Sequence, residues 1–294
     1  MVVSIEELAC VDTLVWLRTG SAAASRLGLS QSTISRRVNH VAKLLGLRFF
    51  KPDGEWQTLG DQTILNLERH VHQLYRWIHG LDLRIEGQYH SGPILCNPIP
   101  AGWLPGNFDF MEIHTPLKLL RTGIIDAWIA CYPDVPDHDD SELACFHLDR
   151  LPTHLVVAEG HPLLQLGNRL SLEDIVTYPS VALPDNAFPK LQQLLQKKGL
   201  WNLPLSMKRY SNGKWEGQMA KDLTIGYANS LTLRLFSEPH IILPIDIQIE
   251  TGDTLVVPRA YAENEHLLKL LTTLKARAAK LADQFPDMRV VEDG

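Results

Sequence analysis

The side chains best suited to chemistry lie at the start of a helical segment between Gln31 and Leu45. Amide and hydroxyl groups come first, and arginines follow one turn later. When the first turns of a helix enter the major groove of DNA, such groups form hydrogen bonds with base edges. We therefore expect this segment to bind double-stranded DNA, although a merely solvated helix face would have a similar composition. The expected base contacts come from Gln31, Ser32, Thr33 and Arg36, and the expected phosphate contacts from Ser35, Arg37 and Lys43.

The charge distribution supports this expectation. The chain has 294 residues and a formal net charge of −6, which by itself argues weakly against a nucleic-acid partner. Between Gly20 and Lys51, however, there are six basic residues and no Asp or Glu. Residues 91–294 carry 18 basic and 25 acidic residues, so the acidity lies in the second part of the chain. For DNA binding this distribution matters more than the total charge.

Metal and enzymatic chemistry lack the residue spacings that they require. Twelve histidines and an acidic loop could supply such groups; the loop contains Asp134, Asp137, Asp139 and Asp140. The chain has no HExxH, GxSxG, P-loop or GxGxxG motif, however. No zinc-ligand spacing relates the four cysteines, which are Cys10, Cys96, Cys131 and Cys145. We expect no catalytic residue, no metal and no cofactor.

Three short helices are expected to position the polar face. Ser4 and Glu7 have capping-box spacing at the start of the first helix, which runs to about Arg18. A short second helix ends near Leu27, Gly28 allows a tight turn, and Ser30 can cap the third helix. This spacing is typical of a helix-turn-helix.

A heptad pattern of apolar residues follows. Their spacings alternate between three and four residues, which predicts a helix from Asp61 to about Ile85. About 25 helical residues at 1.5 Å each form a rod of about 37 Å, whose apolar stripe needs a partner. A second copy of the chain is the expected partner, and packing against the chain's own body is the alternative. The predicted dimerisation residues are Ile64, Leu67, Val71, Leu74, Ile78 and Leu81.

Beyond Gly92 the pattern predicts an α/β region. Short apolar runs at Ile94–Cys96 and Leu155–Ala158 are expected strands. A helix is expected through Leu117–Leu120, and an amphipathic helix from Glu263 to Leu281 is expected to close the region.

Three strings of residues resemble the LysR-type transcriptional regulators. They are Gly20–Leu27, then Leu29–Val38 with its Ser-Gln-Ser-x-x-Ser-Arg sequence, and then Leu44–Lys51 with Leu-Gly-x-x-Phe-Phe. The stretch from Leu155 to Pro179 resembles part of the sensory region of the same family.

The resemblance implies an α/β multidomain fold. Residues 1–60 would form an all-α winged helix-turn-helix, with residues 50–58 as the wing and Lys51 near the DNA backbone. Residues 61–87 would form a long dimerising linker helix. Residues 92–294 would form a regulatory domain with two α/β lobes around a cleft, like that of the periplasmic binding proteins. The resemblance therefore implies a sequence-specific transcriptional regulator that binds an inverted repeat as a dimer.

The resemblance also implies a small-molecule effector in the cleft. Asn97, Thr224 and Tyr227 are the predicted effector-binding residues. In this family a hydroxyl after the first strand of the sensory region commonly contacts the effector. If Ile94–Cys96 is that strand, the stretch from Gly92 to His114 offers no Ser or Thr.

The expected assembly is a homodimer or homotetramer, and RNA polymerase is a candidate partner. No stretch approaches the roughly 18 apolar residues of a membrane-spanning helix, and the N-terminus does not resemble a secretory signal. We therefore expect a cytoplasmic protein with no membrane partner. A divergent family member that acts through protein contacts, without an effector, is the alternative function.

Overall fold

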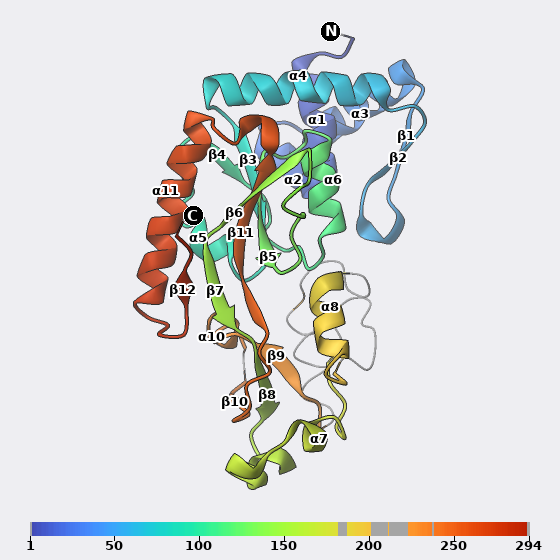
Figure 1. Ribbon diagram of the computed structural model, residues 1–294. Coiled ribbons are helices and arrows are strands. Elements are labelled where there is room, and N and C mark those ends of the chain that lie inside the picture. The colour runs from blue at the N-terminus through green and yellow to red at the C-terminus, as the bar shows by residue number, and fades with distance from the viewer. Residues whose placement is uncertain (1, 182–186, 201–210, 212–222, 237, 293–294) are drawn as a thin grey trace.

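The computed structural model describes residues 2–181, 187–200, 211, 223–236 and 238–292 (Figure 1). An N-terminal helical unit and helix α4 lie at the top of Figure 1, and two α/β lobes lie below them. Within the described residues, no helix is both long and apolar enough to cross a membrane.

The N-terminal unit is a winged helix. Its helices are α1 (Ile5–Leu17), α2 (Gly20–Leu27) and α3 (Gln31–Leu45), and its wing is the hairpin of β1 (Arg48–Phe50) and β2 (Gln57–Leu59). The predicted capping box of Ser4 and Glu7 is present in both directions. Gly28 ends α2 in the left-handed conformation, and the Ser30 hydroxyl accepts a hydrogen bond from the Thr33 N–H. The expected helix-turn-helix is thus confirmed.

Helix α4 (Thr63–His79) is shorter than the sequence pattern suggested. It ends at Gly80, which is left-handed with φ 60°, and after Asp82 the chain enters strand β3 (Leu83–Gly87). A side chain at position 80 would collide with the His266 ring, so this turn needs glycine. The prediction that the helix continues to Ile85 was therefore wrong. Leu81 lies outside the helix, and Ile85 is fully buried in a sheet.

Lobe I is built on a mixed sheet. Along the sheet the strand order is β12-β7-β11-β5-β3-β4, and β6 also pairs with β11. The bounds are β4 (Trp103–Pro105), β5 (Ala127–Tyr132), β6 (Leu143–His147), β7 (Asp149–Pro152), β11 (Glu250–Pro258) and β12 (Arg289–Val290).

Different helices pack against the two faces of this sheet. One face packs against α5 (Gly92–Leu95) and α11 (Glu265–Ala282) through a cluster that includes Ile85, Ile129 and Leu270. The other face packs against α6 (His114–Arg121) and the end of α1. The predicted helices around Leu117–Leu120 and over Glu263–Leu281 are confirmed, whereas the predicted strand Ile94–Cys96 is replaced by α5.

Lobe II is smaller. Its sheet has β8 (His154–Ala158) between β9 (Gly226–Ala228) and β10 (His240–Ile242), so the strand predicted at Leu155–Ala158 is confirmed. Among the described residues its helical elements are η2 (Pro162–Arg169), α7 (Leu172–Ile175), α8 (Pro189–Gln196) and α10 (Ser230–Leu233). The 3-10 turns η1 (Pro52–Gly54) and η3 (Arg259–Tyr261) lie elsewhere. The chain crosses between the lobes along β7 into β8 and returns into β11, which pairs with β7 through Thr251 and Leu151.

A buried ion network joins the winged helix, α4 and β3. Asp12 of α1 accepts a hydrogen bond from Arg69 Nε of α4 at 2.7 Å, and its other oxygen lies 3.8 Å from Arg84 Nη1 of β3. Arg76 of α4 binds Asp126 through Nε and Nη2 at 2.8 and 2.9 Å. Burial is the main cause that lowers the pKa of Arg84 to about 10. Removing one partner from such a network leaves an uncompensated buried charge.

We predict that Asp12→Ala strongly destabilises the chain. Arg69 and Arg84 would lose their shared carboxylate in a buried site, so the free energy of unfolding should fall by about 3–5 kcal/mol. Urea denaturation measures this change. The matched control is Glu6→Ala, which removes an exposed acid from the same helix. Equal effects of the two substitutions would contradict the role given to Asp12.

Candidate nucleic-acid interface and interlobe cavity

Helix α3 turns one face inward and the other to solvent. Ile34, Val38 and Val41 are buried in the core of the winged helix. Five of the seven predicted DNA-contacting residues of the helix are exposed: Gln31, Ser32, Ser35, Arg36 and Lys43. The two others, Thr33 and Arg37, are half-buried. The polar face predicted from the sequence is therefore available to a partner.

Local contacts orient several of these side chains. Arg36 Nη2 donates to the Thr33 hydroxyl at 3.3 Å, so the two side chains lie together near the start of α3. Arg37 Nη1 lies 3.7 Å from Cys10 Sγ, which directs Arg37 toward α1. Lys51, which directly follows β1 in the wing, is exposed, and its amine donates to the Arg18 carbonyl at 2.8 Å.

Helix α4 has an exposed apolar face. All six predicted dimerisation residues, from Ile64 to Leu81, are 47–64% exposed. The face that packs on the chain's own body is the opposite one, with Leu65, Gln73 and Trp77 buried. The alternative that this stripe packs against the chain's own body is therefore wrong. Among the described residues nothing covers it.

A small cavity of about 80 Å³ lies between the lobes. Its lining combines aromatic and apolar side chains with hydroxyl, amide and imidazole groups: Tyr89, His90, Met111, Cys131, Thr153, Phe188, Leu191, Tyr227, Ala228, Asn229, Thr232 and Thr251. Tyr227 is the one predicted effector residue in this lining. Thr224 is buried elsewhere in lobe II, and Asn97 is exposed beyond α5.

The prediction that Asn97 binds an effector failed because the first strand of the sensory region was assigned to the wrong segment. The first strand of lobe I is β3, not the segment Ile94–Cys96, because the linker helix ends before Leu83. The residues after the first strand are therefore Tyr89, His90 and Ser91. Two of them carry the hydroxyls that seemed to be missing, and Tyr89 and His90 line the cavity. The strand-like alternation of Leu83, Arg84, Ile85 and Glu86 was the signal that the heptad pattern concealed.

Two polar atoms at this cavity have no hydrogen-bond partner among the described residues. They are His90 Nδ1 and Thr153 Oγ1, and both residues are more than nine-tenths buried. Burial lowers the pKa of His90 to about 4, so its imidazole is neutral at pH 7. A ligand that supplied hydrogen-bonding groups here would satisfy both atoms.

Behind His90 lies a pair of buried carboxyl groups. His90 Nε2 is 3.7 Å from Asp253 Oδ1, and the Asp253 N–H donates to Asp149 Oδ1 at 3.0 Å. Burial raises the pKa of Asp149 to about 6. Burial and the neighbouring Asp149 charge raise the pKa of Asp253 well above its usual range. The pair joins β7 to β11, the two strands that cross between the lobes.

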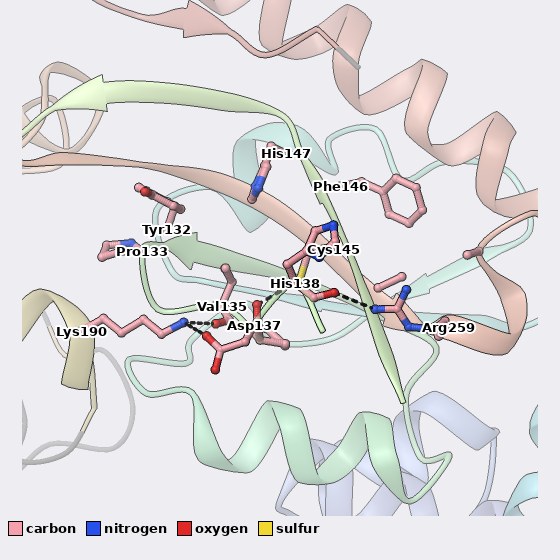
Figure 2. Close-up of a pocket in the computed structure, with 13 residues that line it drawn as sticks. Tyr132, Pro133, Val135, Asp137, His138, Cys145, Phe146, His147, Lys190 and Arg259 are labelled. Atoms are coloured by element: carbon pink, nitrogen blue, oxygen red, sulfur yellow. Dashed lines mark hydrogen bonds and ion pairs between the residues drawn. The ribbon is translucent and has the colours of Figure 1, made fainter. Parts of the chain in front are cut away.

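A larger open pocket of about 520 Å³ lies beside the acidic loop (Figure 2). Lys190 donates to Asp137 Oδ1 and to the Val135 carbonyl, and Arg259 donates to the His138 carbonyl. Figure 2 shows these two basic side chains at opposite sides of the pocket, each holding part of the loop. Burial raises the pKa of the Cys145 thiol to about 11. These groups brace a loop and do not converge on one point.

The acids of this loop also have structural partners. Asp134 accepts hydrogen bonds from the N–H groups of Lys190 and Leu191 at the start of α8. Asp140 accepts from the Glu142 and Leu143 N–H groups. Among the described residues, no group of three or more His, Cys, Asp or Glu side chains could hold a metal ion.

Comparisons with known proteins identify the fold. Residues 107–208 match the family model described as the LysR substrate binding domain. Full-length OxyR from Pseudomonas aeruginosa, solved as a variant, is 15% identical with a TM-score of 0.58 over 92% of this chain and 94% of that one. Full-length CbnR in complex with its target DNA is 12% identical with a TM-score of 0.53, over 93% of this chain and 99% of that one. No curated protein matches the chain by sequence.

OxyR from Corynebacterium glutamicum, also a variant, gives a TM-score of 0.53 at 15% identity, over 95% of this chain and 94% of that one. At such identities the likeness shows a shared fold. The fold class expected from the sequence is confirmed, including the sensory region with two α/β lobes like those of the periplasmic binding proteins.

We predict that Asp149→Asn changes how stability depends on pH. Because the pKa of Asp149 is higher in the folded chain than in the unfolded one, this carboxyl contributes less stability as pH rises from about 4 to about 6. The variant has no carboxyl at position 149 and therefore does not lose this stability as pH rises. Its unfolding free energy minus that of the wild type should therefore rise between pH 4 and pH 7, by up to about 3 kcal/mol.

Urea unfolding at several pH values measures this difference. His90, whose lowered pKa favours stability at higher pH, is present in both proteins, so its contribution cancels. Loss of the Asp149 charge also lowers the pKa of Asp253, which changes the difference in the same direction. The control variant is Asp283→Asn at an exposed position. A difference that stays constant with pH would contradict the assignment.

Proposed function

We propose that this chain, which carries a LysR substrate binding domain at residues 107–208 and has the fold of full-length LysR-type regulators, is a sequence-specific transcriptional regulator. The exposed polar face of α3, in a winged helix beside an exposed apolar α4, is the observation that carries the proposal. We further propose three units. Residues 1–60 bind DNA, α4 dimerises, and the regulatory region begins at β3 instead of at Gly92.

In this proposal α3 enters the major groove. Gln31, Ser32 and Arg36 reach base edges from the exposed face, and Thr33 holds the Arg36 guanidinium beside them. Phosphate contacts come from Ser35, Arg37 and Lys43, and from Lys51 at the wing. Their charges make binding dependent on salt, because each neutralised phosphate releases counterions.

The apolar face of α4 is proposed as the dimer interface. With 17 residues, α4 is about 25 Å long at 1.5 Å per residue, enough for two full heptads. A second copy carries the same apolar stripe, so the two stripes can cover each other around a twofold axis. Such a dimer presents two α3 helices to one side of DNA, which favours an inverted repeat.

The interlobe cavity is the proposed effector site. Tyr227 is retained from the sequence prediction, and Tyr89, His90 and Thr153 join it, whereas Asn97 and Thr224 do not line the cavity. The unsatisfied atoms of His90 and Thr153 would bind the polar part of an effector, and Phe188 and Leu191 its apolar part.

The small size of the cavity also favours a second function. At about 80 Å³ it is well below the roughly 300–1,000 Å³ typical of ligand pockets. In this second function the chain acts through a protein partner, such as RNA polymerase or another copy in a tetramer, without an effector. A thermal-shift panel of metabolites distinguishes the two functions. An effector at a hundredfold excess over its Kd should add about 2.7 kcal/mol of stability, whereas a broad panel without any shift favours the protein partner.

We predict that Arg36→Ala abolishes selective DNA binding. In a selection of bound fragments from the source genome, the wild type should enrich an inverted-repeat site, and its affinity should fall as salt rises. Loss of a bidentate base contact costs about 1–3 kcal/mol per half-site, so the variant should lose this enrichment.

The control variant for this selection is Arg289→Ala, which removes an exposed arginine from β12. It should enrich the same site as the wild type. Identical enrichment by Arg36→Ala would mean that α3 does not read bases.

We predict that Leu67→Asp in α4 disrupts the dimer. The substitution puts a charge in the middle of an apolar stripe that dimerisation would bury, and this cost applies twice in a symmetric interface. Sedimentation velocity should show a shift toward monomer, while Leu268→Asp, at an exposed leucine on α11, should leave the dimer intact. A monomeric wild type, or a dimeric Leu67→Asp, would contradict the proposed interface.

A further inference from the structure

The winged helix packs directly on lobe I of its own chain. Trp16 and Leu17, at the end of α1, are 1% and 3% exposed. They belong to a buried cluster with Leu120 of α6 and Trp128 of β5, and Ala22 of α2 packs against it. The N-terminal unit therefore covers part of a sheet face that would otherwise be apolar and exposed. We call this contact between the five residues the docking surface.

Polar contacts surround this apolar centre. Trp16 Nε1 donates to Glu86 Oε2 of β3 at 2.9 Å, in a fully buried position. Arg18 pairs with Asp109, and Arg26 Nη2 donates to the Pro105 carbonyl at 2.7 Å. Burial lowers the pKa of Arg26. Arg26 belongs to the basic segment noted in the sequence, yet this contact turns it toward lobe I.

The ion network of Asp12 adds a third connection. Through Arg69 it ties α1 to α4, and through Arg84 it ties α1 to β3. Undocking the winged helix from lobe I would separate Asp12 from Arg84 and Trp16 from Glu86. It would break these interactions between charged and polar groups, in addition to exposing apolar surface to water.

The docked arrangement leaves α3 free. Gln31, Ser32 and Arg36 are exposed, and the docking surface uses α1 and α2 instead. The winged helix therefore need not leave lobe I in order to present its polar face to DNA.

Strand β3 connects the docking surface to the interlobe cavity. Glu86 accepts from Trp16 of the winged helix and, through its other oxygen, from the Phe108 N–H. Three residues further along the same chain segment, Tyr89 begins the cavity lining, and His90 follows. A displacement of β3 at the cavity would thus shift Glu86 and its contact with Trp16 of α1 directly, without involving α4 or a second subunit.

We propose that the winged helix and lobe I of one subunit form a permanently docked body, in which β3 couples the interlobe cavity to the DNA-binding helices. The DNA-binding unit then moves with lobe I, and no hinge between α4 and β3 separates them. The docking itself is independent of the proposed function, whereas its use in an effector response rests on that function.

The test is native-state thiol labelling of the full chain. A cysteine is introduced into the docking surface by Leu17→Cys or, as a second reporter, by Leu120→Cys, because these side chains are 3% and 1% exposed. Cys10, fully buried in the core of the winged helix itself, is the internal reference. Mass spectrometry measures the labelling rate at each site.

A permanently docked surface should open only together with the core of the winged helix. The new cysteine should then be labelled within about tenfold of the rate at Cys10. Labelling more than about a hundredfold faster than at Cys10 would show separate undocking and overturn the proposal. Adding Trp16→Ala to Leu120→Cys is the positive control, and it should accelerate labelling of the new cysteine.

A second arm adds a DNA fragment enriched in the genomic selection. Unchanged slow labelling in the DNA complex supports docking during DNA binding, and acceleration overturns it. If no fragment binds, the proposed function fails. The rates in the free protein still decide whether the winged helix is docked.

Discussion

The buried carboxylate of Asp12 is the interaction on which the arrangement of this molecule depends. A charge at 1% exposure is stable only with partners of opposite charge, and here those partners come from two other elements. Arg69 extends from α4 and Arg84 from β3, so one side chain of α1 fixes three segments relative to one another. Because one face of α4 is used in this way, its apolar face is directed outward. The same constraint places Trp16 against Glu86 and the end of α1 on the sheet of lobe I.

Much of the N-terminal region could be predicted from sequence because its signals are local. The capping box of Ser4 and Glu7, the left-handed turn at Gly28 and the Ser30 cap depend on neighbouring residues only, and all are present. Helical periodicity also predicted that the apolar residues from Ile64 onward share one face, and the structure shows that this face is exposed. By contrast, the end of α4 was predicted wrongly, because Leu81 and Ile85 continue the heptad spacing past Gly80. Gly80 ends the helix in the left-handed conformation, and the ring of His266, from a distant part of the chain, leaves no room for a larger residue there.

The wrong end assigned to α4 also led to wrong predictions for the residues that line the cavity. With the first strand assigned to Ile94–Cys96, the expected effector contact fell on Asn97, which is exposed. The heptad spacing assigned Leu83–Gly87 to the end of the linker helix, whereas this segment is a strand whose Arg84 and Glu86 are buried by partners that are distant in sequence. Tyr227, which was predicted from the resemblance to the family's sensory region, lies in β9 and lines the cavity. His90 and Thr153 carried no local signal, since their importance comes from the neighbours that the fold brings together.

We propose that α3 reads DNA from a dimer held together by α4, with each winged helix docked on its own lobe I. A structure of the full-length protein bound to an enriched fragment tests this claim most directly. We expect two α3 helices in successive major grooves, paired α4 stripes, and a Trp16 side chain that still donates to Glu86. A complex in which α3 lies outside the groove, or in which the α4 stripes face solvent, would contradict it.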